Sequence, residues 1–203
     1  MRICIDIDGT IAGRNTKYFI ERCNQVLDLK LALERLEGLT YKAFLRQKEV
    51  INYRDRIGDI PFYAQLEAIE QEPQMLLTLP TLHQAVEGVT RLSQLGELSY
   101  LTVRKCEQSP QQDSAIQEAT KQWLAARAFP GHQQVMFCMS LMNKLIRLYK
   151  LIEATQDNAV LIDDLYTSLL EEFAYLRAGH HPRFQPETCL RIADTLQRHL
   201  ILV

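Results

Sequence analysis

The chain begins with a short alternating stretch that predicts a buried β-strand. Ile3, Ile5 and Ile7 alternate with less hydrophobic positions. The turn residues Gly9 and Thr10 follow directly. Alternation that stops at such a turn is typical of a strand with a polar end.

Residues 13–79 follow a different pattern, which is helical and loop-like throughout. Apolar residues recur at helical spacing over 19–27 and again over 62–69. Thr40 is a candidate N-cap for a shorter helical piece between them. We therefore expect residues 13–79 to form a small helical subdomain, or cap, inserted after the first strand.

After residue 80 the pattern alternates between helix and strand. The predicted elements are a helix over 82–92 ended by Gly96, a strand over 98–103, a helix over 116–124, a strand over 135–139, a helix over 145–152 and a strand over 159–162. Such alternation implies a parallel sheet with right-handed crossovers. The expected fold is α/β, a Rossmann-like parallel sheet with helices on both faces, built from residues 1–12 and 80–203.

The tail of the chain is less regular. One helix is expected from Leu165, and a stripe of Leu190, Ala193 and Leu196 predicts another. Residues 199–203 fit either the end of that helix or a last strand, and periodicity does not decide between them.

Composition excludes several classes of protein. The 203 residues are 47% hydrophobic and 24% charged, with a net charge of -2, which excludes disorder and gives no nucleic-acid or membrane-surface signature. The longest nearly apolar stretch, 135–142, is far short of the roughly 20 residues of a membrane helix. Asp6 interrupts the first apolar stretch too early for a secretory signal. We expect a cytoplasmic protein that binds neither a nucleic acid polymer nor a membrane.

The cysteines give no sign of a metal or disulfide framework. They are odd in number and never form a C-x-x-C pair, and they are Cys4, Cys23, Cys106, Cys138 and Cys189. We expect buried free thiols.

The residues that end the predicted strands are unusually polar. Asp6 and Asp8 follow the first strand, Thr102 and Arg104 the second, and the acid pair at 163–164 the last. Ligands of open α/β sheets bind beyond the carboxyl ends of the strands. Four carboxylates at one rim repel one another unless a cation offsets their charge. A hard divalent ion, most simply Mg²⁺, would neutralise them and bridge to a phosphate.

Four of these segments carry a family resemblance. The string Ile3-Cys-Ile-Asp-Ile-Asp-Gly-Thr-Ile11, with Thr102, a downstream Lys and the pair Asp163-Asp164, resembles the ordered motifs of the haloacid dehalogenase-like (HAD) hydrolases. The resemblance covers about residues 1–13 and 80–175, and the order of the motifs makes it specific.

A narrower resemblance concerns the middle of the chain. Tyr100-Leu-Thr-Val-Arg104, a helix containing Thr120, Trp123 and Leu124, and then Phe129-Pro130 are similar to the 5'(3')-deoxyribonucleotidase and related nucleotidase branch. This similarity implies a nucleotidase-like substrate.

The HAD resemblance implies a role for each motif residue. Asp6 would be the nucleophile that forms an aspartyl phosphate, and Asp8 the general acid and base. Asp6, Asp8 through its backbone carbonyl, and Asp164 would hold Mg²⁺, with Asp163 either binding the ion or lying behind its ligands. Thr102 would donate a hydrogen bond to the phosphoryl oxygens.

Several assignments stay open at this level. The motif lysine is Lys144, which opens a helix after a strand, in preference to Lys150 one and a half turns later. Arg104 either binds substrate or pairs with an acid on the surface. Arg14 and Tyr18, near the start of the cap, are candidates for substrate binding or simply solvate a helix N-terminus.

Structural explanations also exist for the motif residues themselves. The first acid pair is compatible with a turn, and Asp163 and Asp164 with an N-cap. Thr102 is compatible with an ordinary strand-end hydroxyl. His180 and His181 look like a metal or acid–base pair, but their position in a turn favours a surface loop.

The expected function is Mg²⁺-dependent hydrolysis of a small soluble phosphate ester, such as a nucleoside monophosphate, through an aspartyl phosphate. One alternative is a catalytically weak relative that binds a phosphorylated ligand or partner without turning it over, and another is a receiver-like phospho-acceptor. A receiver domain carries its acid pair on the first strand and its acceptor on a middle strand, and here that order is reversed.

Overall fold

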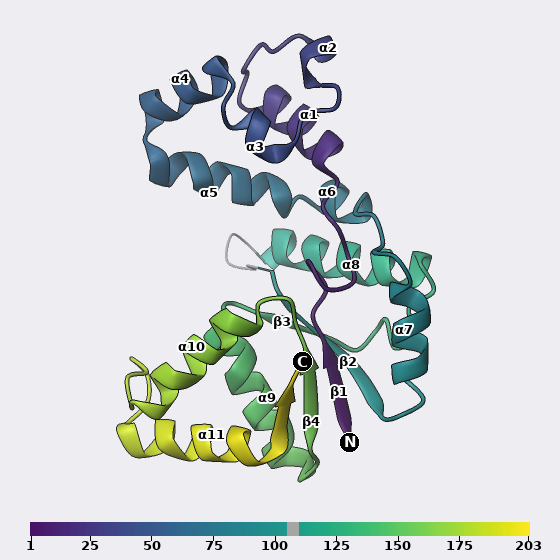
Figure 1. Cartoon of the computed structure of the whole chain (residues 1–203), viewed down its shortest axis with the longest axis vertical. Coiled ribbons are helices and arrows are strands. Elements are labelled where there is room, and N and C mark those ends of the chain that lie inside the picture. The colour runs from purple at the N-terminus through teal and green to yellow at the C-terminus, as the bar shows by residue number, and fades with distance from the viewer. Residues whose placement is uncertain (105–109) are drawn as a thin grey trace. The chain divides into compact units, whose positions relative to one another are not determined.

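The computed structural model describes residues 1–104 and 110–203 (Figure 1). The described chain divides into two compact units. The first contains residues 1–13 and 81–203, and the second contains residues 14–80.

The first unit is built on a parallel β-sheet. Its strands are β1 (Arg2–Ile5), β2 (Glu97–Val103), β3 (Val135–Cys138), β4 (Ala159–Ile162) and β5 (Leu200–Leu202). The five strands lie in the order β3-β2-β1-β4-β5, and each neighbouring pair is parallel. With helices around the sheet, this confirms the expected Rossmann-like α/β fold.

The strand order creates a switch point beside the first strand. From β1 the chain adds β2 and then β3 on one side, and it returns to add β4 and β5 on the other. In open α/β sheets the connections leave a crevice at such a point, beyond the carboxyl ends of the two strands. The crevice is therefore expected between the ends of β1 and β4.

Helices cover both faces of the sheet. The flanking helices are α7 (Ala85–Leu92), α8 (Pro110–Ala126), α9 (Leu141–Thr155), α10 (Tyr166–Arg177) and α11 (Pro186–His199). In Figure 1, α9, α10 and α11 lie together on one side of the sheet, away from α7 and α8.

Strand alternation assigns each inward side chain to one of these helical layers. Cys4, Leu101 and Leu161 belong to the apolar cluster of α9, α10 and α11. On the other face, the Tyr100 ring meets Phe129, which stacks on Trp123 of α8 at 5.5 Å between centroids. Because side chains alternate between faces, these contacts also determine which way the following strand-end residues point.

The tail adds a strand that periodicity left undecided. Residues 200–202 form β5, and the Val203 backbone N–H donates to the Leu161 carbonyl at 2.8 Å. The stripe predicted for the preceding helix is correct for Ala193 and Leu196, which are buried. It is wrong for Leu190, which is 46% exposed, because the buried face instead includes Cys189 and Ile192.

The second unit consists of helices and loops. The helices are α1 (Thr16–Val26), α2 (Leu33–Leu36), α3 (Tyr41–Phe44), α4 (Lys48–Ile57), α5 (Asp59–Glu70) and α6 (Pro73–Leu77). Asn15 caps α1 by accepting from the Tyr18 N–H, and Thr40 caps α3 by accepting from the Ala43 N–H. Asn15 also donates to the Thr78 carbonyl at 3.2 Å, which ties the two ends of the unit together.

Two further expectations concern the cysteines and membranes. Cys4, Cys23, Cys138 and Cys189 are buried free thiols, and Cys106 lies outside the described residues. Burial raises the pKa of the Cys4 thiol to about 12, so this thiol stays protonated. In the described part of the chain, no helix combines the length and apolarity needed to cross a membrane.

The core of the first unit should respond strongly to cavity formation. Leu148 of α9 is fully buried, so Leu148→Ala should lower the free energy of unfolding by about 2–5 kcal/mol. Leu190→Ala, at an exposed position on α11, should change it by no more than about 0.5 kcal/mol. Urea unfolding followed by the fluorescence of Trp123, the only tryptophan, measures both. Equal losses would contradict the assignment of Leu148 to the core.

Candidate active site

The parallel register brings two acids side by side at the switch point. Ile5 of β1 is paired with Ile162 of β4, and the Asp6 N–H donates to the Ile162 carbonyl at 2.9 Å. The next residues in register are Asp6 and Asp163. Both follow the alternation toward the α9 side of the sheet, so two carboxylates are directed to the same place.

Lys144 meets these two acids from α9. Ser140 begins this helix as its N-cap, accepting from the Asn143 N–H at 3.1 Å, and Lys144 lies in the first turn. The Lys144 Nζ donates to Asp6 Oδ1 and to Asp163 Oδ2, both at 2.6 Å, and its side chain is only 1% exposed. Lysine is rarely buried without partners, and here two carboxylates share its charge.

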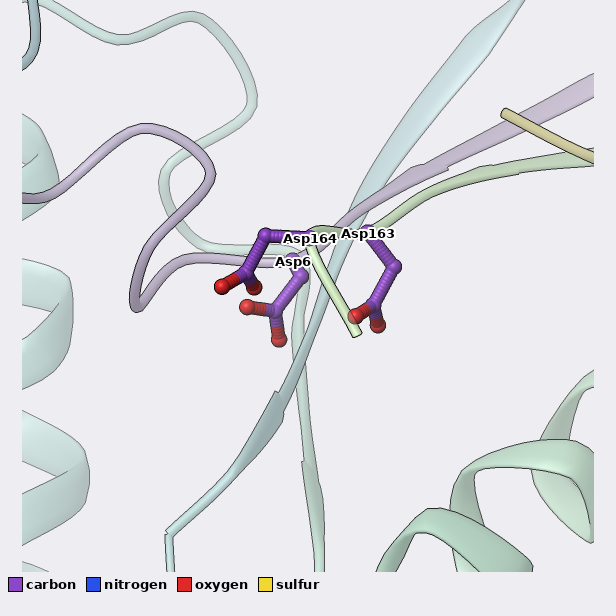
Figure 2. A group of neighbouring side chains, drawn as sticks. All are labelled: Asp6, Asp163 and Asp164. Atoms are coloured by element: carbon purple, nitrogen blue, oxygen red, sulfur yellow. The ribbon is translucent and has the colours of Figure 1, made fainter. Parts of the chain in front are cut away.

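A third acid completes a carboxylate group at the ends of β1 and β4. Asp6, Asp163 and Asp164 offer oxygen atoms that all lie within 4.8 Å of one another (Figure 2). The Asp164 N–H donates to Thr10 Oγ1 at 3.1 Å. A side chain at Gly9 would collide with the Asp164 carboxylate, so glycine leaves the space that this carboxylate fills.

The charges in this group are incompletely balanced by Lys144. Burial raises the pKa of Asp6 to about 7; Lys144 opposes this rise, and the neighbouring Asp163 reinforces it. Burial disfavours the charged form of Lys144, but the two acids outweigh it and raise its pKa. A further cation would hold Asp6 ionised. The three carboxylates therefore fit a hard divalent ion such as Mg²⁺, which prefers oxygen ligands.

Asp8 lies apart from this carboxylate group. Its Oδ1 accepts from Arg104 Nη2 at 2.9 Å, and its Oδ2 accepts from Arg104 Nε at 3.1 Å and from Thr102 Oγ1 at 3.2 Å. The Asp8 side chain is nevertheless 46% exposed. Burial opposes its ionisation, but Arg104 outweighs that effect and lowers the pKa of Asp8.

Arg104 is held on both sides. Its side chain is 2% exposed, and its remaining Nη1 donates to Thr120 Oγ1 on α8. Thr120 is fully buried, and its hydroxyl donates to the Ile116 carbonyl at 2.7 Å. Arg104 thus pairs with an acid, but in a buried position rather than on the surface. All three nitrogens of its guanidinium have partners within the described residues.

Three further candidate residues are Lys150, Arg14 and Tyr18. Lys150 is exposed on α9. Arg14 and Tyr18 belong to the second unit, where Arg14 pairs with Glu70 at 2.6 Å and its guanidinium lies 4.5 Å from the centroid of the Tyr41 ring.

The predicted histidine pair lies in the turn before α11. The His180 ring contacts Tyr175, and the His181 ring stacks on Phe184. Neither belongs to the carboxylate group found among the described residues.

Sequence reasoning missed the contribution of α8 to this site. At the level of sequence, Thr120 is only part of a family resemblance and is given no chemical role. The feature that could have identified it is its hydroxyl on the same helical face as the buried Ile116 and Trp123. A polar group on an apolar face usually has a buried partner, and Arg104 is that partner.

Comparisons with known proteins do not assign this chain to a family. No family model matches the sequence, and neither does any curated protein. One similar solved structure is a HAD family hydrolase from Deinococcus radiodurans R1 with bound phosphate and sodium. It is 12% identical, with a TM-score of 0.47, over 100% of this chain and 90% of that chain. At so low an identity, function has to be inferred from this chain's own side chains.

The raised pKa of Asp6 predicts a pH dependence of stability in the metal-free protein. Its usual pKa is 3.8 and its folded value is about 7, so between these values the folded state binds more protons than the unfolded state. The free energy of unfolding should therefore fall as pH rises from about 4 to 7 and level off above. Asp6→Asn should weaken this decline. Urea unfolding in chelator at pH 5 and pH 8 measures it.

A control with Mg²⁺ checks the cause. At pH 8, added Mg²⁺ should stabilise the wild type more than Asp6→Asn, because binding to the folded state alone shifts the equilibrium. An identical pH dependence in the two proteins would show that Asp6 is not the residue responsible.

Proposed function

We propose that this chain is a HAD-like, Mg²⁺-dependent phosphomonoester hydrolase with Asp6 as its nucleophile. The observation that carries the proposal is the position of Asp6 at the switch point, held by the buried Lys144 beside Asp163 and Asp164. A carboxylate between a fixed cation and a divalent-ion site is suited to attack an anionic phosphate, because both positive charges reduce the repulsion.

In the first half of the reaction Asp6 attacks phosphorus. The bond from phosphorus to the ester oxygen breaks, and its electron pair leaves with that oxygen. Asp8 gives a proton to the departing alcohol, and for this it must first take up a proton from solvent, because Arg104 lowers its pKa. Lys144 offsets the charge on Asp6 and on the transferred group. Asp8 lies two residues beyond the nucleophile, directly before the turn at residues 9–11.

In the second half water hydrolyses the aspartyl phosphate. The oxygen of water attacks phosphorus, the bond to Asp6 breaks, and Asp8 accepts the proton that water loses. Thr102 would donate to a phosphoryl oxygen. Because its single O–H donates to Asp8 in the structure, this role requires the hydroxyl to rotate.

The divalent ion would be held by Asp6, Asp164 and the Asp8 carbonyl, with Asp163 beside Lys144. When bound, Mg²⁺ neutralises the phosphate and helps to orient it. The chain's own residues supply the nucleophile, the proton transfers and the fixed positive charge.

The substrate is proposed to be a small soluble phosphate ester, with nucleoside monophosphates preferred over sugar phosphates. In the chain, the second unit follows soon after β1, the strand that precedes the proposed nucleophile. An insertion at this position suits a cap that excludes water and selects the leaving group. Arg14 and Tyr18 at its start combine a cation, hydrogen-bond donors and an aromatic ring.

Asp6→Asn should abolish hydrolysis of a generic aryl phosphate, with a loss of at least about a thousandfold in turnover, because the nucleophile is lost. The wild-type reaction should also stop in excess chelator. Phosphate release, measured with and without Mg²⁺, tests both.

The matched control is Asp194→Asn, which changes an exposed acid on α11. Its turnover should equal that of the wild type. Substantial turnover by Asp6→Asn, or full activity in chelator, would rule out the proposed chemistry. A wild-type chain that becomes phosphorylated by an activated donor but does not release phosphate would favour the receiver-like alternative.

The cap prediction concerns selectivity. Arg14→Ala combined with Tyr18→Ala should raise KM for the best nucleoside monophosphate about tenfold, the loss expected from one hydrogen bond to a charged group. Aryl phosphate turnover should be unaffected, since a small aryl ester needs little from the cap. Steady-state kinetics over a panel of nucleotides and sugar phosphates measures both.

Arg35→Ala is the control for loss of an ion pair in the cap, because Arg35 pairs with Glu49 at 2.7 Å on its surface. It should change neither KM for the best nucleoside monophosphate nor turnover of the aryl phosphate. If sugar phosphates are cleaved as fast as nucleoside monophosphates, the nucleotidase assignment fails and the phosphatase core remains.

A further inference from the structure

The contacts of Asp8 point to a supporting pair of residues behind it. Arg104 binds both oxygens of the Asp8 carboxylate, and Thr120 binds the opposite side of the Arg104 guanidinium. These contacts connect the exposed Asp8 side chain to two residues that are almost completely buried. A carboxylate held by two parallel N–H donors has little freedom to rotate.

The hydrogen bonds also distinguish the two Asp8 oxygens. Oδ2 accepts from Arg104 Nε and from Thr102 Oγ1, which uses both of its lone pairs. Oδ1 accepts only from Arg104 Nη2 among the described residues and keeps one lone pair. With the side chain 46% exposed, Oδ1 has a lone pair that can accept a proton from water, whether the Thr102 hydroxyl stays on Oδ2 or rotates to the phosphoryl group.

We propose that Arg104 and Thr120 are positioning residues that hold Asp8 with Oδ1 directed to the water that attacks the phosphorylated Asp6. This inference rests on the proposed function and assigns residues to its second half-reaction. In that step the water oxygen bonds to phosphorus, and the phosphorus–oxygen bond to Asp6 breaks with its electron pair returning to Asp6. One water proton passes to Asp8 Oδ1, and inorganic phosphate is released.

Thr120 gives a sharper test than Arg104, because it touches Asp8 only through Arg104 and keeps its size when replaced by valine. Thr120→Val removes the hydroxyl that accepts from Arg104. Thr120→Ser keeps this hydroxyl and is the matched control. Arg104→Lys is a second variant, which keeps the charge but loses the two parallel donors.

The experiment uses the full chain with Mg²⁺ and an aryl phosphate, whose good leaving group needs no proton from Asp8. Thr120→Val should lower the decay rate of the phosphorylated enzyme about tenfold, a part of what a general base contributes. The variant should accumulate phosphorylated chain, detected by intact mass after quenching. Because phosphorylation itself is unaffected, kcat/KM should stay within about twofold of the wild type while kcat and KM fall together.

Thr120→Ser should behave as the wild type, and Arg104→Lys as Thr120→Val. In an Asp8→Asn background, Thr120→Val should cause no further loss, since the residue that it positions has already lost its function. A merely structural role would instead lower kcat and kcat/KM together in the valine variant.

Two results would overturn the inference. One is a phosphorylated Thr120→Val enzyme that decays as fast as the serine variant. The other is a fall in kcat/KM with unchanged decay, which would indicate that Arg104 binds the substrate phosphate. Failure of the proposed function itself would look different, because the wild type would then show no turnover that depends on Asp6.

Discussion

The arrangement of the site depends on one buried ammonium group. Lys144 is almost inaccessible to solvent, and it is stable there because Asp6 and Asp163 both accept from its Nζ at 2.6 Å. Removing either acid would leave a buried charge with half of its compensation, which is costly in a protein interior. The helix α9, the strand β1 and the strand β4 are therefore held at one point. The same contact keeps the proposed nucleophile oriented before any substrate arrives.

Two layers of the α/β sandwich contribute different chemistry to this point. The α9 side supplies the fixed positive charge, because Asp6 and Asp163 have the strand parity that faces α9. The α8 side supplies the support of Asp8, through Arg104 and Thr120. Asp6 and Asp8, the proposed nucleophile and proton carrier, are thus positioned by opposite helical layers, although only one residue separates them in the chain. A mutation on the α8 side can therefore disturb the support of Asp8 without changing the contacts of Asp6 with Lys144.

The balance of charges explains why a divalent ion suits the site. Three carboxylates within 4.8 Å share a single ammonium, and burial raises the pKa of Asp6 to about 7. Asp8 has an Arg of its own, which lowers its pKa. Asp6 therefore needs a further cation to stay ionised, whereas Asp8 does not. The pH dependence of stability expected for the metal-free protein comes from Asp6.

Local patterns in the sequence determined most of the fold and the motif positions. Alternation at Ile3 and Ile5, with helical spacing after residue 80, predicted the strands and helices of the α/β sheet, because these periods reflect burial on one or two faces. The polar strand ends identified Asp6, Asp8 and the pair at 163–164. Only the tertiary structure decided what each of them contacts. It paired Asp8 with the buried Arg104, because Thr120 on α8 lies where that guanidinium ends. Residues 200–202 form a strand because they pair with the edge of β4. The spacing of hydrophobic residues within 200–202 carries no information about that edge, which lies about 40 residues earlier in the chain.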